Sequence, residues 1–88
     1  MVSKAYTITA KEGLHARPCS LIVTEAMKYT ADLSLAYNES EKNLKSIMAI
    51  MALGVPHNAT IEIRANGADE EAALESINAI IYAEKLAQ

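Results

Sequence analysis

The sequence has 88 residues and a formal net charge of −3, with 51% hydrophobic and 22% charged residues. These values predict one globular domain, residues 1–88, with a modest core. The acidic balance argues against direct nucleic-acid binding, and no apolar run approaches the ~18 residues of a membrane span. The first residues lack a signal-peptide pattern. Because the single Cys19 can form no internal disulfide, we expect a cytoplasmic location. A monomer that docks transiently is the default expectation.

The first half of the chain carries three strand patterns and one helix pattern. Residues 5–10 alternate between apolar and polar, which predicts a half-buried strand. Apolar residues then recur at three- and four-residue spacing, which predicts a helix over about 16–28. Residues 33–37 alternate again as a second strand. The polar residues 38–41 predict a tight reversal into a short strand at about 42–44.

The second half of the chain predicts two helices around one strand. Ser46 is a favoured N-cap and Gly54 a favoured stop, so a helix of about two turns is expected between them. Residues 60–65 alternate as a fourth strand. Asp69 is expected to cap a final helix that runs to about Lys85. The order β-α-β-β-α-β-α, with one apolar face per strand, predicts an α+β two-layer open-faced sandwich, whose four-stranded antiparallel sheet is covered on one face by three helices.

His15 is the residue whose position suggests chemistry. It follows the turn residue Gly13 and lies just ahead of the first predicted helix. A neutral imidazole is a nucleophile near pH 7 and can form a covalent phosphoryl intermediate. Free N–H groups and the helix dipole favour a phosphoryl group there, and Arg17 can donate charge-assisted hydrogen bonds to it. On the residues alone, the plainer interpretation remains open: His15 merely caps a helix, and Arg17 is a solvated surface charge.

Other chemistries find little support in the sequence. No second His or Cys stands at metal-ligand spacing, since His57 lies far away in a predicted loop. No Gly-rich phosphate cradle followed by Lys is present. We therefore expect no metal and no cofactor. A chain that can accept phosphate without a nucleotide site is typical of a carrier and not of an enzyme.

Two motifs resemble those of a known family. The stretch Gly13-Leu14-His15-Ala16-Arg17-Pro18 resembles the active-site signature of HPr, the histidine-containing phosphocarrier family of the bacterial phosphoenolpyruvate:sugar phosphotransferase system. The stretch Asn43-Leu44-Lys45-Ser46-Ile47-Met48 resembles the regulatory-serine motif of that family, and residues 51–54 continue it. The motifs occur in the order and spacing of the family, and the resemblance covers essentially the whole chain.

The resemblance implies a role for each residue of the first motif. His15 would accept phosphate at Nδ1 from phosphorylated enzyme I and pass it to the enzyme IIA domains of sugar permeases. Arg17 would stabilise the charge of the transferring group, and Ala16 and Pro18 would support the helix N-terminus. For Ser46 the resemblance implies phosphorylation by HPr kinase/phosphorylase, beside the plainer role of an N-cap worth ~1 kcal/mol. Both roles can hold together.

The middle helix is more apolar than one buried face requires, which predicts an exposed patch formed by Ile47, Met48 and Met51. Core packing is the alternative, although Ile50 and Leu53 suffice for it. The resemblance implies that enzyme I, enzyme IIA domains and a catabolite-control transcription regulator dock there. Weaker candidates for the same surface are Leu14, Ser20 and Leu21.

Some residues depart from the family pattern. Cys19 stands where the family commonly has Ala, and we expect it to be buried. Ala49 and Ala52 replace residues that are often Gly and Ser. Two other functions stay open: a small ACT-like regulatory ligand-binding module, which leaves both motifs unexplained, and an HPr paralogue with a purely regulatory role. Such paralogues usually change the histidine, whereas His15 is present.

Overall fold

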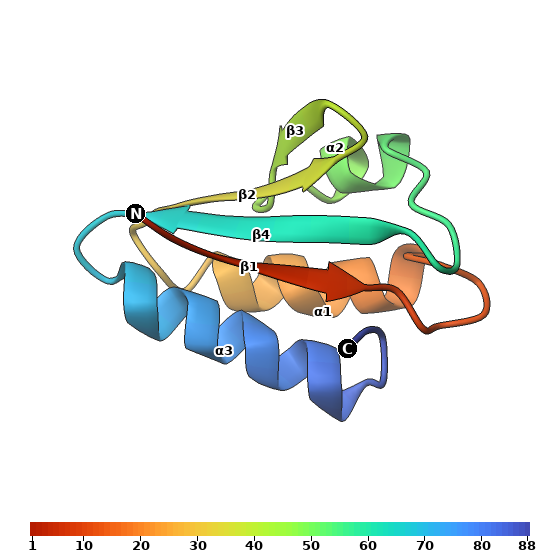
Figure 1. The fold of residues 1–88 in the computed structure, drawn as a ribbon. Helices are drawn as coiled ribbons and strands as arrows, with labels where there is room; N and C mark the ends of the chain where they lie inside the picture. Colours follow the sequence, from red (N-terminus) through yellow and green to blue (C-terminus); the bar gives the residue numbers. More distant parts are fainter.

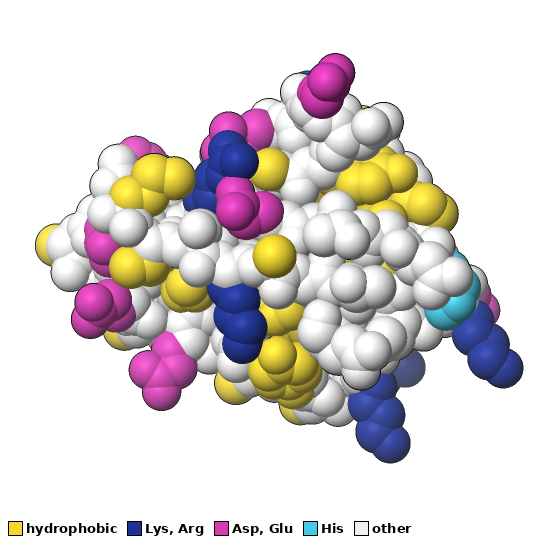
Figure 2. Space-filling view, in the orientation of Figure 1, with side chains coloured by type: hydrophobic (Ala, Val, Ile, Leu, Met, Phe, Trp, Pro, Cys, Tyr) yellow, Lys and Arg dark blue, Asp and Glu magenta, His cyan; other side chains and the backbone are white.

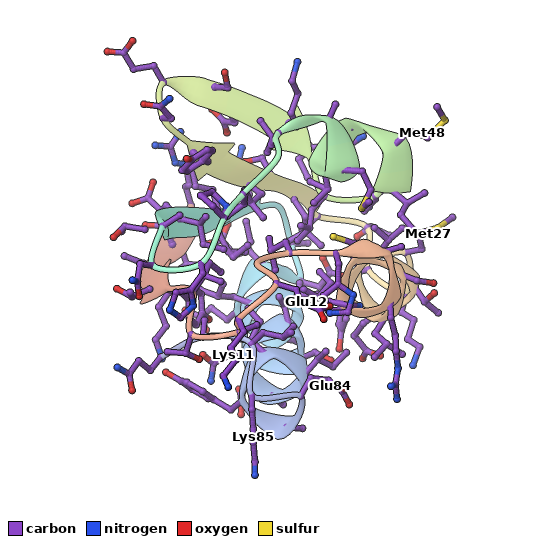
Figure 3. All side chains as sticks on the ribbon, turned by 90° about the vertical axis from the view of Figure 1, so that its right-hand side faces the viewer. Lys11, Glu12, Met27, Met48, Glu84 and Lys85 are labelled. Carbon is purple, nitrogen blue, oxygen red and sulfur yellow. The ribbon has the colours of Figure 1, made fainter.

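The computed structural model describes residues 1–88 and has the element order predicted from the sequence. Its strands and helices, in chain order, are β1 (Val2–Thr7), α1 (Ala16–Ala26), β2 (Asp32–Tyr37), β3 (Ser40–Asn43), α2 (Ile47–Ala52), β4 (Thr60–Asn66) and α3 (Glu70–Ala83). The strands form one antiparallel sheet in the order β1-β4-β2-β3. The helices pack on one face and leave the other open (Figures 1 and 3). The predicted open-faced α+β sandwich is therefore confirmed.

The bounds of β1 differ from the prediction. The strand covers residues 2–7 instead of 5–10, because its register with β4 pairs Val2 with Ala65 and Thr7 with Thr60. Ile8 makes only an isolated bridge to Ala87. The alternation of residues 5–10 therefore identifies the buried face correctly at Tyr6 and Ile8. It does not show where the pairing of β1 with β4 begins and ends.

The core lies between the sheet and the helices. Leu35 and Ile63 from the sheet and Ile77 and Ile81 from α3 are almost completely buried. Burial alternates along β2 and β4 and recurs every four residues along α3, so each element turns one apolar side inward. Cys19 belongs to the same core, as predicted. Burial raises the pKa of its thiol, which disfavours the reactive thiolate.

Of the two helix N-caps predicted from the sequence, one is correct and one is wrong. Ser46 caps α2, because its Oγ accepts the N–H of Ala49 at 3.3 Å. Asp69 occupies the N-cap position of α3 but makes no capping bond with its side chain. Its carboxylate instead accepts the N–H groups of Thr30 at 2.9 Å and Ala31 at 2.8 Å. Asp69 thus ties the loop after α1 to the start of α3.

No helix of the structure is both long and apolar enough to cross a membrane.

Candidate functional site

His15 occupies the N-cap position of α1, with extended backbone (φ −94°, ψ −179°). Its carbonyl accepts the N–H of Cys19 at 3.2 Å, while its imidazole makes no capping bond. The ring is therefore free to face solvent, and 43% of the side chain is exposed. Pro18 lies inside the first turn and is buried, where its lack of an N–H leaves no donor unsatisfied.

The loop before His15 is held by a segment from the second half of the chain. Gly13 has φ +69°, and a Cβ atom at this position would lie 2.3 Å from the carbonyl oxygen of Val55. That same oxygen accepts the N–H of Leu14 at 3.0 Å. Only glycine fits this close approach in a left-handed conformation. The segment after α2 therefore fixes the position of the histidine loop.

The first turn of α1 offers donors that the chain does not use. The amides of Ala16 and Arg17 have no acceptor in the structure, as expected for the first residues of a helix. The Arg17 side chain is exposed and forms no ion pair or hydrogen bond. An anion beside His15 would thus meet two free N–H groups, the positive end of the helix dipole and an unpaired guanidinium.

Glu12 was not singled out by the sequence, yet its Oε2 lies 3.6 Å from Nε2 of His15. Figure 3 looks onto this end of the molecule, and Glu12 projects from the loop towards the start of α1. The only sequence signal was its place three residues before His15 in a tight turn. A carboxylate facing Nε2 favours a proton on that nitrogen and leaves the Nδ1 lone pair open.

His57 lies closer to this loop than its place in the sequence suggests. Its Nδ1 is 3.1 Å from the carbonyl oxygen of Ala10, so the segment after α2 contacts the loop at a second point. His57 is a loop residue, as predicted. No group of three or more His, Cys, Asp or Glu side chains in the structure could hold a metal ion.

Exposed apolar side chains gather on α1 and α2. Met48 is 81% exposed and Met51 40% exposed, and Ser20, Leu21 and Ile47 are also exposed. Leu14 corrects the prediction: it is buried in the core because its backbone bond to Val55 turns the residue inward. Met27, which the sequence did not single out, is 66% exposed. Figure 3 shows Met27 and Met48 projecting to the same side from α1 and α2.

The largest hollow of the molecule, about 440 Å³, lies elsewhere. Its lining includes Ala5, Ala36 and Thr60 on the open face of the sheet, and no residue of the histidine loop. The candidate site is therefore an exposed surface and not a pocket.

The fold and the exposed histidine at the start of its first helix define the class of small phosphocarrier domains. Residues 2–83 match the family model described as the phosphotransferase-system HPr component phosphorylation site. The chain therefore belongs to the HPr family, and the ACT-like alternative falls away.

Solved structures agree with this membership. The histidine-containing phosphocarrier protein of a mycoplasma is 37% identical, with 99% of each chain covered and a TM-score of 0.97. The phosphocarrier protein HPr of Bacillus anthracis is 39% identical, covering 90% of this chain and 94% of that one, with a TM-score of 0.82. Crh, a catabolite-repression protein of Bacillus subtilis solved as an intertwined, domain-swapped dimer, is 38% identical over both whole chains, with a TM-score of 0.74.

Proposed function

We propose that this chain carries phosphoryl groups on Nδ1 of His15, which accepts them from phosphorylated enzyme I and passes them to enzyme IIA domains of sugar permeases. The observation that carries the proposal is the half-exposed imidazole beside the unused amides of Ala16 and Arg17. The Nδ1 lone pair attacks phosphorus, the donor leaves, and the reverse step releases the group to the acceptor.

Arg17 stabilises the transferring group in this proposal. Its guanidinium has no competing partner in the structure, so it can form planar, charge-assisted bonds to phosphoryl oxygens as charge develops. Phosphoryl transfer needs positioned positive charge more than covalent chemistry by the protein. The contact with Glu12 complements this role, because it favours Nδ1 over Nε2 as the attacking nitrogen.

The docking surface for these partners is formed by exposed side chains of α1 and α2. Its apolar members are Leu21, Ile47, Met48 and Met51, with Met27 at the end of α1 as an addition, and Ser20 is its polar member. Methionine adapts to surfaces of different shape, which suits a carrier that must dock to both donor and acceptors. Burial removes Leu14 from this surface.

Ser46 is the regulatory site in this proposal, phosphorylated by HPr kinase/phosphorylase. Its Oγ is partly buried and accepts a single long hydrogen bond, from Ala49. A phosphate at that helix start is electrostatically favourable, and it would add negative charge beside Ile47 and Met48. The added charge would alter docking of enzyme I and favour a catabolite-control transcription regulator.

The test of the His15 proposal uses purified enzyme I and phosphoenolpyruvate. The wild-type chain is expected to take up one acid-labile phosphate, and His15→Ala to take up none. His57→Ala is the matched control: it removes the other histidine together with its contact to Ala10, and it should still take up one phosphate per chain, whatever the rate. Uptake by His15→Ala would overturn the proposal.

The test of Ser46 uses ATP and HPr kinase, which should place an acid-stable phosphate on the wild type and none on Ser46→Ala. Because Ser46→Ala also removes a cap, Ser46→Asn keeps an acceptor at the helix start and still lacks the hydroxyl. Ser40→Ala serves as the control for a serine elsewhere. Acid-stable phosphate on either Ser46 variant would contradict the assignment.

A purely regulatory role is the second candidate, favoured by the likeness to Crh over the whole of both chains. It predicts phosphorylation at Ser46 with no transfer through His15. The enzyme I assay therefore separates the two candidates directly.

A further inference from the structure

The outer edge of β1 is not fully paired. Within β1, the backbone groups of Val2, Lys4 and Tyr6 face β4, as the continuing bond from the Ile8 N–H to the Ala59 carbonyl shows (2.8 Å). Successive residues of a strand point their backbone groups to opposite edges. Ser3, Ala5 and Thr7 therefore face away from the sheet, and the N–H and C=O groups of Ser3 and Ala5 have no partner.

The same edge already accepts an extended segment one position further along. Thr7 and Gln88 exchange both backbone hydrogen bonds, at 2.8 and 3.0 Å, and Ile8 bridges Ala87 in antiparallel register. Strand addition to β1 is thus compatible with the fold at this edge. Ala5 and Ser3 face the same edge as Thr7, two and four residues before it, and their free N–H and C=O groups point outward in the same way.

A groove of about 290 Å³ runs beside these free groups, between β1 and the first half of α3. Val2 and Leu74 give it an apolar lining, and Glu71 and Glu75 supply carboxylates one helical turn apart. Figure 2 shows acidic side chains gathered over this part of α3, at the left of the view. Neither Glu71 nor Glu75 forms an ion pair.

The one cation of the groove, Lys4, bonds to Asn78 and not to the two carboxylates. The ammonium of Lys4 donates to Oδ1 of Asn78 at 3.0 Å and lies over the rings of Tyr6 and Tyr82, 5.5 and 5.1 Å from their centroids. Tyr6 donates to the same oxygen at 2.6 Å, and burial, with a smaller contribution from Tyr82, raises its pKa to about 12. Tyr6 therefore stays a neutral donor, and Lys4 forms no ion pair with either carboxylate.

We propose that the outer edge of β1 and its groove bind an extended basic segment of a partner protein, added antiparallel as a fifth strand next to Ser3 and Ala5. Side chains opposite Lys4 and Val2 point to the helix side, because strand side chains alternate between faces. An apolar side chain opposite Lys4 covers its stem, and an Arg or Lys opposite Val2 places its stem on Val2 and Leu74 and its charge at Glu71 and Glu75. Main-chain bonds give affinity and the groove gives selectivity. This surface lies at the N-terminal end of β1, away from the His15 loop (Figure 1).

The probe is the peptide acetyl-Thr-Val-Thr-Arg-Thr-amide, titrated into the full chain and followed by backbone amide NMR. We expect the Ser3 and Ala5 amides to shift and to exchange more slowly with solvent. In this register the first and third peptide residues lie opposite Ala5 and Ser3 and donate their N–H groups to the carbonyls of those residues. A peptide N-methylated at these two positions lacks both donors and should produce no such change. Methylation at the second and fourth residues, whose N–H groups point outward, should leave binding intact.

Variants of the chain test the groove. The charge reversals Glu71→Lys and Glu75→Lys together should weaken binding at least about threefold. The pair Glu39→Lys and Glu84→Lys makes the same total charge change at exposed positions outside the groove and should not. Shifts confined to α3 with unchanged Ser3 and Ala5 amides would overturn strand addition. Concentration-dependent shifts of these amides without peptide would identify a second copy as the occupant and also overturn the proposal.

Discussion

Oε2 of Glu12 lies 3.6 Å from Nε2 of His15, within the turn that leads into α1. The two side chains are 77% and 43% exposed, so the contact is screened by water and weak. The contact matters for which imidazole nitrogen carries the proton and adds little stability. A carboxylate beside Nε2 favours the tautomer whose Nδ1 is unprotonated.

Glu12→Gln should slow phosphorylation of His15 by enzyme I by no more than about fivefold, the factor that an exposed ion pair of up to ~1 kcal/mol gives. The imidazole nitrogen signals in NMR should show a smaller share of the tautomer protonated at Nε2. Glu84→Gln, which removes another carboxylate at the same end of the molecule (Figure 3), is the control. A faster rate for Glu12→Gln would mean that repulsion of the phosphoryl group outweighs orientation of the ring.

Gly13→Ala should lower the free energy of unfolding by at least about 2 kcal/mol, because the new Cβ meets the Val55 carbonyl and a left-handed conformation costs ~1–2 kcal/mol by itself. Gly54 has a similar φ of +61° but open space around it. Gly54→Ala should therefore cost only about 1 kcal/mol. Urea unfolding of both variants measures the difference, and equal losses would argue against the close approach to Val55.

Glu39→Gly should raise the free energy of unfolding by about 0.5–1 kcal/mol. Asn38 and Glu39 connect β2 to β3 with φ values of +50° and +70°, a pair of positive angles that Asn-Gly adopts most readily in two-residue hairpins. Lys42→Gly, inside β3, is the comparison and should destabilise the protein. Thermal unfolding reports both changes, and a loss of stability in Glu39→Gly would contradict this account of the turn.

Asp69 should contribute to acid unfolding. The N–H of Thr30 is the main cause that lowers the pKa of its carboxyl, and the N–H of Ala31 acts in the same direction. Because the unfolded chain binds this proton more readily, the contribution is complete above the unfolded pKa of about 3.9 and is lost as pH falls through the lower pKa of the folded state.

Asp69→Asn should thus be less stable than wild type at neutral pH, with a shallower loss of stability below about pH 4. Denaturant unfolding at a series of pH values gives both quantities. Glu71→Gln removes a carboxylate without a hydrogen-bond partner from the same helix and should behave like the wild type. If Asp69→Asn kept the full acid dependence, other carboxylates would have to account for it.

The predictions from sequence are correct for features that neighbouring residues determine. Periodicity gave the order of the elements, and capping preference gave the role of Ser46 in α2. The prediction was wrong where distant segments meet. Leu14 is buried because Val55 binds its amide, and Asp69 turns away from its own helix because Thr30 and Ala31 present free N–H groups.

The same limit applies to the candidate site. The motif around His15 could be found in the sequence, since its residues are contiguous. Glu12 and Met27 could not, because the contact with Nε2 and the exposure of Met27 depend on how the loop and the helices are packed. Their residue types alone fit many surface positions.

The pairing of β1 has a consequence for the order of folding. β1 bonds only to β4 and to the tail at Gln88, which come from the other end of the chain, so forming these contacts requires the largest loops to close. The hairpin of β2 and β3, by contrast, needs only a two-residue turn. Since non-local contacts slow folding, we expect β1 to dock late. The loop that carries His15 follows β1 directly, so this histidine should reach its final geometry only when both ends of the chain have met.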